Sequence, residues 1–168
     1  MSNPAGPGAY ADVNTLLETH ARLRPAKVFA ESPDQHARIT FGEFEALTRR
    51  FANFLAAAGV GHGDRISILA DNSIEALVAF WGGLRAGVIV NPVNVEIRAQ
   101  HVTHILEAVA PKLVFWSGEL PIPPRPGWIA LDGLAGLLAG APDTPIAARP
   151  ARTDWSLIDY TSGTTDTP

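Results

Sequence analysis

The chain has 168 residues, which is enough for one domain and hardly two. Hydrophobic residues make up 46% of it and charged residues 18%, a balance that supports a buried core and disfavours disorder. The formal net charge of −4 lacks the basic footprint of a nucleic-acid-binding protein. The absence of cysteine excludes a disulfide framework, a thiolate nucleophile and a cysteine-based zinc site, and fits a reducing cytoplasm.

Neither a targeting signal nor a membrane span is expected. Residues 1–11 are small, polar and rich in Pro and Gly, without the basic and apolar regions of a signal peptide, and they predict a flexible arm. Residues 74–95 are the most apolar part of the chain, but they carry Glu75, Arg85 and three glycines. This pattern predicts a buried helix and strand rather than a membrane span, and therefore a cytoplasmic protein.

The first forty residues predict a helix followed by a small hairpin. Asp12 can cap a helix that runs to about Leu23, where Pro25 ends it. Residues 28–30 and 38–40 read as two short strands around a turn at residues 32–34.

The next stretch predicts a long amphipathic helix. Thr40 and Glu43 form a capping box, in which each side chain satisfies a backbone donor of the other residue. Four large apolar residues then follow at spacings of three and four: Phe44, Leu47, Phe51 and Leu55. Gly59 is expected to end this helix.

The middle of the chain alternates buried strands with helices. Strands are predicted at residues 65–70, 88–90 and 113–116, the second being stopped by Asn91 and Pro92. A helix between the first two strands is capped by Asn72 or Ser73, and its predicted inner face consists of Ile74, Leu77, Trp81 and Leu84. A helix at residues 96–109 precedes the third strand. This order predicts an α/β fold with a mostly parallel sheet flanked by helices.

The last fifty residues predict less regular structure. Residues 121–126 are rich in proline and predict an extended connector, followed by a short strand at residues 128–132 and a short helix at residues 133–140. Residues 141–154 predict a surface linker, and residues 155–160 a short strand that leads into the final loop.

The final loop gathers hydroxyl side chains around one glycine. The residues concerned are Thr161, Ser162, Gly163, Thr164 and Thr165. Hydroxyl groups donate hydrogen bonds, and glycine lets the backbone curl so that successive N–H groups point inward, which suits a phosphate. The spacing is not that of the common P-loop, and on composition alone a solvated tail is an alternative.

This loop resembles the phosphate-binding loop of adenylate-forming enzymes, which include acyl-CoA synthetases, luciferase-like enzymes and peptide-synthetase adenylation domains. That loop usually reads Y-T-S-G-T-T-G-x-P-K-G. The chain matches it from Tyr160 to Thr165 and at Pro168, and departs from it at Asp166. Segments 39–44, 58–66 and 84–94 resemble other family segments in the right order. The sequence N-P-V-N at residues 91–94 is more similar to acyl-CoA synthetases than to amino-acid adenylation domains.

The resemblance implies an enzyme that activates a carboxylate with Mg²⁺ and ATP to an acyl-adenylate and often passes the acyl group to coenzyme A, as in fatty acid metabolism. Residues 12–168 would be an incomplete N-terminal α/β domain of such an enzyme, ending in the loop whose residues Thr161, Ser162, Gly163, Thr164 and Thr165 hold the β- and γ-phosphates of ATP. The partners implied are a small-molecule carboxylate and a nucleotide. No catalytic residue and no metal ligand is assigned, because that machinery lies downstream in family members. We therefore expect a fragment that is inactive by itself and that self-associates through uncovered surfaces.

Other interpretations stay open. The chain could be a stand-alone module that binds a phosphate compound without chemistry, or a truncated product without a ligand. His101, His104 and Glu107 could form a metal cluster, but their helical positions favour a solvated face. The aromatic residues Phe44, Phe51, Phe54 and Trp81 could line an acyl pocket, but their spacing favours a core. Asp159 could act as a base or bond to a turn, and Ser162 lacks the surroundings of a nucleophile.

Overall fold

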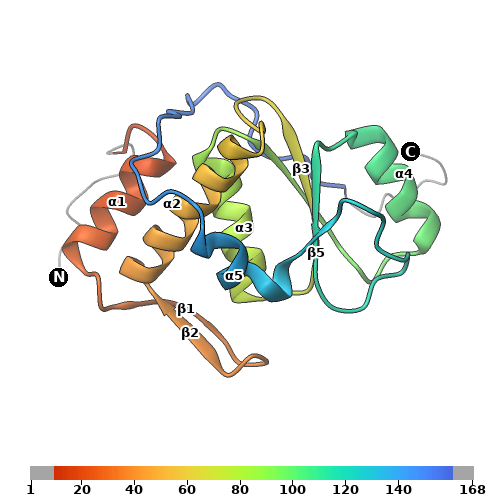
Figure 1. The fold of residues 1–168 in the computed structure, drawn as a ribbon, viewed down its shortest axis with the longest axis horizontal. Coiled ribbons are helices and arrows are strands. Elements are labelled where there is room, and N and C mark those ends of the chain that lie inside the picture. Colours follow the sequence, from red (N-terminus) through yellow and green to blue (C-terminus); the bar gives the residue numbers. More distant parts are fainter. Residues whose placement is uncertain (1–9, 161–168) are drawn as a thin grey trace.

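A computed structural model describes residues 10–160, and residues 1–9 and 161–168 lie outside the described part. The predicted α/β class is confirmed. A parallel sheet lies between helices, with α4 on one side and α2 and α3 on the other (Figure 1). An antiparallel hairpin projects from the molecule next to the start of α2 (Figure 1).

The described elements alternate along the chain as the sequence indicates. The helices are α1 (Val13–Leu23), α2 (Phe41–Ala57), α3 (Ile74–Arg85), α4 (Ala99–Val109) and α5 (Leu134–Ala139), with a 3-10 turn at Leu131–Gly133. The hairpin consists of β1 (Val28–Ser32) and β2 (Ala37–Thr40), and the sheet of β3 (Arg65–Leu69), β4 (Ile89–Val93), β5 (Leu113–Trp116) and β6 (Ile129–Ala130).

The strand order of the sheet is β4-β3-β5-β6, so the chain steps outward from β3 to β4 and then crosses back to β5. Because parallel crossovers are right-handed, this reversal places α3 and α4 on opposite faces. Each face has its own hydrophobic cluster. The α3 side buries Phe51, Ile66 and Phe115, and the α4 side buries Leu69 and Val102.

The predicted helix caps form as expected. The Asp12 carboxylate accepts a hydrogen bond from the backbone N–H of Thr15 at 2.7 Å. Thr40 and Glu43 make the capping box, and the Thr40 N–H and hydroxyl that donate to Glu43 lower the pKa of its carboxyl. Ser73, rather than Asn72, caps α3. These local bonds fix where three of the helices begin.

The inner face of α3 is only partly the predicted one. Ile74, Leu77, Trp81 and Leu84 are half-buried, whereas Val78, Ala79, Gly82 and Gly83 are buried. A Cβ atom on Gly82 would lie 2.7 Å from a ring carbon of Phe51, and one on Gly83 would lie 2.7 Å from a methyl group of Val90. The helix approaches α2 and the sheet so closely that small residues occupy the centre of its contact face.

Several predicted boundaries are also wrong. Strand β4 runs through Asn91 and Pro92 to Val93, α4 begins at Ala99, and β6 contains two residues. The strand predicted at residues 155–160 joins the sheet through a single bridge between Val90 and Leu157. The predicted linker at residues 141–154 contributes Ile146 to the core, where it is 6% exposed.

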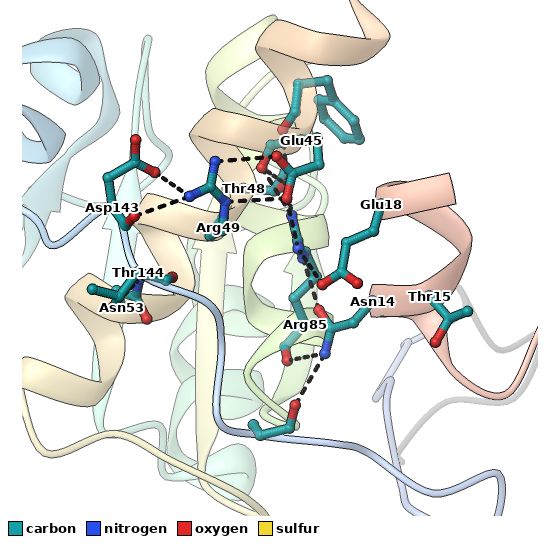
Figure 2. Close-up of polar contacts among 12 residues, drawn as sticks. Asn14, Thr15, Glu18, Glu45, Thr48, Arg49, Asn53, Arg85, Asp143 and Thr144 are labelled. Atoms are coloured by element: carbon teal, nitrogen blue, oxygen red, sulfur yellow. Dashed lines mark hydrogen bonds and ion pairs between the residues drawn. The ribbon is translucent and has the colours of Figure 1, made fainter. Parts of the chain in front are cut away.

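A buried arginine ties the three N-terminal helices together (Figure 2). Arg85 of α3 is the largest of the fully buried side chains. Its Nε donates to Asn14 Oδ1 at 2.8 Å, its Nη1 to Thr48 Oγ1 at 2.9 Å, and its Nη2 to Glu45 Oε1 at 3.0 Å. Burial lowers the pKa of Arg85 and the Glu45 carboxylate opposes that change, so the guanidinium stays charged and paired.

Candidate functional site

The carboxyl ends of β3 and β4 open into a cleft with a volume of about 830 Å³. The hairpin and its tip form one wall, and the first turns of α3 form another. Ligands of open α/β sheets bind outside the carboxyl ends of the strands, close to the point where the strand order reverses. The cleft therefore occupies the part of this fold that is most suited to a ligand.

The hairpin wall is held in place by Gln35. The side-chain oxygen of Gln35 accepts a hydrogen bond from the backbone N–H of Ile74 at 2.8 Å, and its nitrogen donates to Glu75 at 2.7 Å. The first turn of α3 has unpaired backbone donors by its nature, and Ser73 satisfies a further one by accepting from Ala76 at 3.0 Å. The tip of the hairpin is thus fastened to the start of a helix.

The cleft has an apolar floor and an acidic rim. Apolar lining comes mainly from Ile68, Leu77, Phe80, Val93 and Val95. Acidic lining comes from Glu31, Asp34, Asp71, Glu96 and Asp159, and no described lining residue is Lys, Arg or His. A polyphosphate that entered without a cation would meet this negative charge at close range, and a divalent cation between them would offset the repulsion.

Residues 155–160, here called the feeder segment, run along the outer edge of β4. The backbone N–H of Val90 donates to the Ser156 carbonyl at 3.0 Å, and the N–H of Ile158 donates to the Val90 carbonyl at 3.0 Å. Asp159 then lies on the wall of the cleft. The five predicted phosphate-binding residues, Thr161, Ser162, Gly163, Thr164 and Thr165, lie outside the described residues and begin two positions after Asp159.

The other candidate residues are the possible metal cluster on α4 and the aromatic side chains of α2 and α3. His101, His104 and Glu107 are exposed on α4, and residues 10–160 contain no group of His, Asp and Glu side chains able to hold a metal ion. Phe44 and Phe51 are fully buried, and Phe44 stacks on Phe29 with a ring separation of 4.2 Å. These aromatic side chains form core rather than an acyl pocket.

Comparison with known proteins identifies the family. The profile of the AMP-binding enzymes matches residues 17–168. The chain belongs to this family. Long-chain-fatty-acid–CoA ligase FadD13 of Mycobacterium tuberculosis is 30% identical over 169 residues, which cover 94% of this chain and 34% of that ligase. The 3-hydroxybenzoate–CoA ligase of Aromatoleum sp. is 33% identical over 129 residues, which cover 77% of this chain and 23% of that ligase.

Solved structures place the match within the N-terminal domain of the family. The inhibitor-bound N-terminal domain of FACL13 from Mycobacterium tuberculosis aligns with a TM-score of 0.80 and 28% identity, covering 92% of this chain and 42% of that domain. The chain thus spans about a third of the length of FadD13. It corresponds to the N-terminal part of an adenylate-forming enzyme. Within residues 10–160, none of the helices has the length and apolar character needed to span a bilayer.

Sequence reasoning missed three polar residues that shape this part of the AMP-binding fold. Arg85 stands out in the sequence only as a charge in an apolar region, and the available signal of its partners is Thr48, a polar residue among the aromatic positions of α2. The sequence predicts that Asn91 and Pro92 end a strand, and this prediction conceals the role of the Asn91 side chain. Gln35 follows the turn predicted at residues 32–34, and no local pattern indicates that its side chain reaches α3.

Proposed function

We propose that the chain is the N-terminal part of an ATP-dependent acid–CoA ligase, to which it contributes the cleft wall and the phosphate-binding loop. The family match and the CoA ligases among the relatives support this proposal. One observation carries it further. The feeder segment is bonded to the edge of β4 and brings Asp159 to the cleft, two residues before the predicted loop begins.

In this proposal the hydroxyl groups of Thr161, Ser162, Thr164 and Thr165 and the backbone of Gly163 hold the β- and γ-phosphates of ATP. Asp166, which stands where the family usually has glycine, points away from the phosphates. The acidic rim of the cleft makes a Mg²⁺ complex of ATP the fitting form of the nucleotide, since the ion supplies the positive charge that the described lining lacks.

The reaction of the whole enzyme joins an acid to coenzyme A in two steps. A carboxylate oxygen bonds to the α-phosphorus of ATP and pyrophosphate leaves, giving an acyl-adenylate. The thiol of coenzyme A then loses its proton, bonds to the acyl carbon and releases AMP. This chain holds the phosphates during the first step, and we assign it no catalytic residue or metal ligand. We place the enzyme in the cytoplasm, and its relatives include ligases of fatty and of aromatic acids.

The test uses a polypeptide in which the 168 residues are continued by the remaining two thirds that the relatives have. With a panel of fatty and aromatic acids, we expect acid-dependent exchange of pyrophosphate into ATP. Gly163→Val should abolish exchange because its side chain blocks the approach of the backbone to the phosphates. Asp166→Gly is the matched control in the same loop, and should change the apparent ATP affinity by less than about tenfold.

Two outcomes would contradict the proposal. One is a folded continued polypeptide that exchanges no pyrophosphate with any acid of the panel, and the other is full exchange by Gly163→Val. A stand-alone binding module would instead show a thermal shift of the 168-residue chain with Mg-ATP and no exchange in the continued polypeptide. The 168-residue chain alone should show no exchange, because the downstream residues of the family are missing from it.

A further inference from the structure

At the outer edge of β4, the next backbone N–H that should donate to the feeder segment after Val90 is missing. In a parallel pair, alternate residues of a strand present their backbone groups to the same neighbour. Val90 bonds in this way to Ser156 and Ile158, so the next residue of β4 on that side is Pro92. Proline has no backbone N–H, and the Ile158 carbonyl would therefore lose its partner in the ladder.

The side chain of Asn91 replaces the missing donor. Its Nδ2 donates to the carbonyl of Ile158 at 2.9 Å, and its Oδ1 accepts from the hydroxyl of Ser67 at 3.0 Å. Asn91 and Ser67 are register partners on adjacent strands, and both have no exposed surface. Because the carbonyl of Ile158 requires a donor and the Ser67 hydroxyl donates to the other end, the amide of Asn91 has one orientation.

Few other contacts hold the feeder segment. The Ile158 side chain packs against the hydrophobic cluster on the α4 side of the sheet. By contrast, the side chains of Trp155, Leu157 and Tyr160 are 76%, 44% and 39% exposed. Segments with few buried contacts open locally at little free-energy cost, so one additional buried hydrogen bond has a large share in fixing this segment.

We infer that Asn91 is a positioning residue for the phosphate-binding loop: through the Ile158 carbonyl it fixes the backbone three residues before Thr161. This inference rests on the proposed function for its effect on ATP. The anchoring itself concerns described residues and can be tested without any nucleotide.

The test compares Ser67→Ala with Ser67→Ala/Asn91→Val. Replacing Asn91 alone would leave the buried Ser67 hydroxyl unpaired and destabilise the sheet for an unrelated reason. The double variant removes both buried partners, while Ser67→Ala retains the bond from Asn91 to Ile158. Asn53→Ala serves as the matched control, because the Asn53 amide also donates to backbone carbonyls, those of Pro142 and Thr144, away from the feeder segment.

The first measurement is amide hydrogen exchange in the 168-residue chain. We expect the Ile158 amide to exchange at least about fivefold faster in the double variant than in Ser67→Ala. The amides of β3 should be unchanged, and Asn53→Ala should leave Ile158 unchanged. Equal exchange of Ile158 in the double variant and in Ser67→Ala would overturn the inference, whatever the nucleotide affinity.

The second measurement is the KM for ATP of pyrophosphate exchange in the continued polypeptide. We expect the double variant to raise this KM by about tenfold over Ser67→Ala, with a smaller change in kcat at saturating ATP. Faster amide exchange with an unchanged KM would overturn the positioning role. If the parent polypeptide shows no exchange activity, the proposed function fails, and the amide measurement still decides whether Asn91 anchors the feeder segment.

Discussion

The three N-terminal helices are tightly packed around a buried charge, whereas the feeder segment is largely exposed and weakly attached. Between the helices, Arg85 has no exposed surface and its guanidinium is bonded to side chains of α1 and α2. In the feeder segment, Trp155 is 76% exposed and a single bridge joins the backbone to β4. The first region pairs its buried charge within residues 10–160, whereas the second leaves apolar side chains exposed and a strand edge open. Substitutions should therefore change stability in the first region and assembly or ligand binding in the second.

Removing the Arg85 charge should have the largest effect. Arg85→Met leaves the buried Asn14 oxygen and Thr48 hydroxyl without their donor, while the half-buried Glu45 keeps its ion pair with Arg49, and we expect a loss of about 2–4 kcal/mol of unfolding free energy. Urea denaturation measures this loss. Arg149→Met is the control, because Arg149 is 51% exposed and lies 3.6 Å from the same Glu18 that Arg85 reaches. The control should change stability by less than about 0.5 kcal/mol. A loss below about 1 kcal/mol for Arg85→Met would mean that the network is not essential to the helix layer.

The close approach of α3 to α2 gives the next prediction. Gly82→Ala places a Cβ 2.7 Å from the Phe51 ring, and the resulting displacement should cost about 1–3 kcal/mol. Gly136→Ala in α5 is the matched control, since no atom other than those of its neighbours and its own helix backbone lies within 4 Å of the added Cβ. Because alanine is the better helix former, this control should be neutral or stabilising by up to about 1 kcal/mol. Thermal unfolding compares the two, and equal melting temperatures would contradict the tight contact.

The helix layer also shows which parts of the fold could be predicted from the sequence. Local signals were sufficient where a bond joins near neighbours, as in the capping box of Thr40 and Glu43. The alternation of apolar strands and helices predicted the parallel sheet. The size of apolar side chains does not predict the deep face of α3, because this contact depends on the small volume of Gly82 and Gly83.

The candidate site also has a part that the sequence predicts and a part that it does not. The hydroxyl-rich sequence at residues 161–165 is a local motif that indicates the family, and the family profile matches residues 17–168. The cleft could not be predicted, because its walls come from the hairpin, two strand ends and Asp159, which are distant in the sequence. The role of Asn91 was hidden by Pro92: a proline normally indicates the end of a strand, but at a sheet edge it removes one donor and leaves the strand intact.

The open edge of the feeder segment predicts self-association of the 168-residue chain. Among residues 10–160, no strand lies on its outer side, and Leu157 is 44% exposed there. We expect sedimentation or light scattering to show dimers or larger species as concentration rises. Leu157→Lys should weaken this association by about tenfold, because a charge on an edge disfavours pairing with a second chain. Leu23→Lys, at a residue 52% exposed at the end of α1, should not. A parent chain that stays monomeric over a wide concentration range would contradict this prediction.

The smallest effect is expected at Asp64, in the turn that leads into β3. Asp64 accepts hydrogen bonds from the Lys112 ammonium at 2.8 Å and from the Gly61 N–H at 2.9 Å. The Lys112 bond, followed by that of Gly61, lowers the pKa of the Asp64 carboxyl below its usual value of 3.8. At neutral pH, Asp64→Asn should cost no more than about 1 kcal/mol, since the pair is partly exposed and screened by water.

The stabilising contribution of Asp64 should depend on pH. Because the pKa of Asp64 is lower in the folded chain, the unfolded chain takes up the proton first as the pH falls. The contribution of Asp64 is therefore present above about pH 4 and is lost as the pH falls through the lowered pKa. Urea denaturation of the parent chain and of Asp64→Asn should show a difference in unfolding free energy at pH 7 that closes as the pH falls below 3.8. A difference that stays constant over this range would assign the effect of Asp64 to the shape of its turn rather than to its charge.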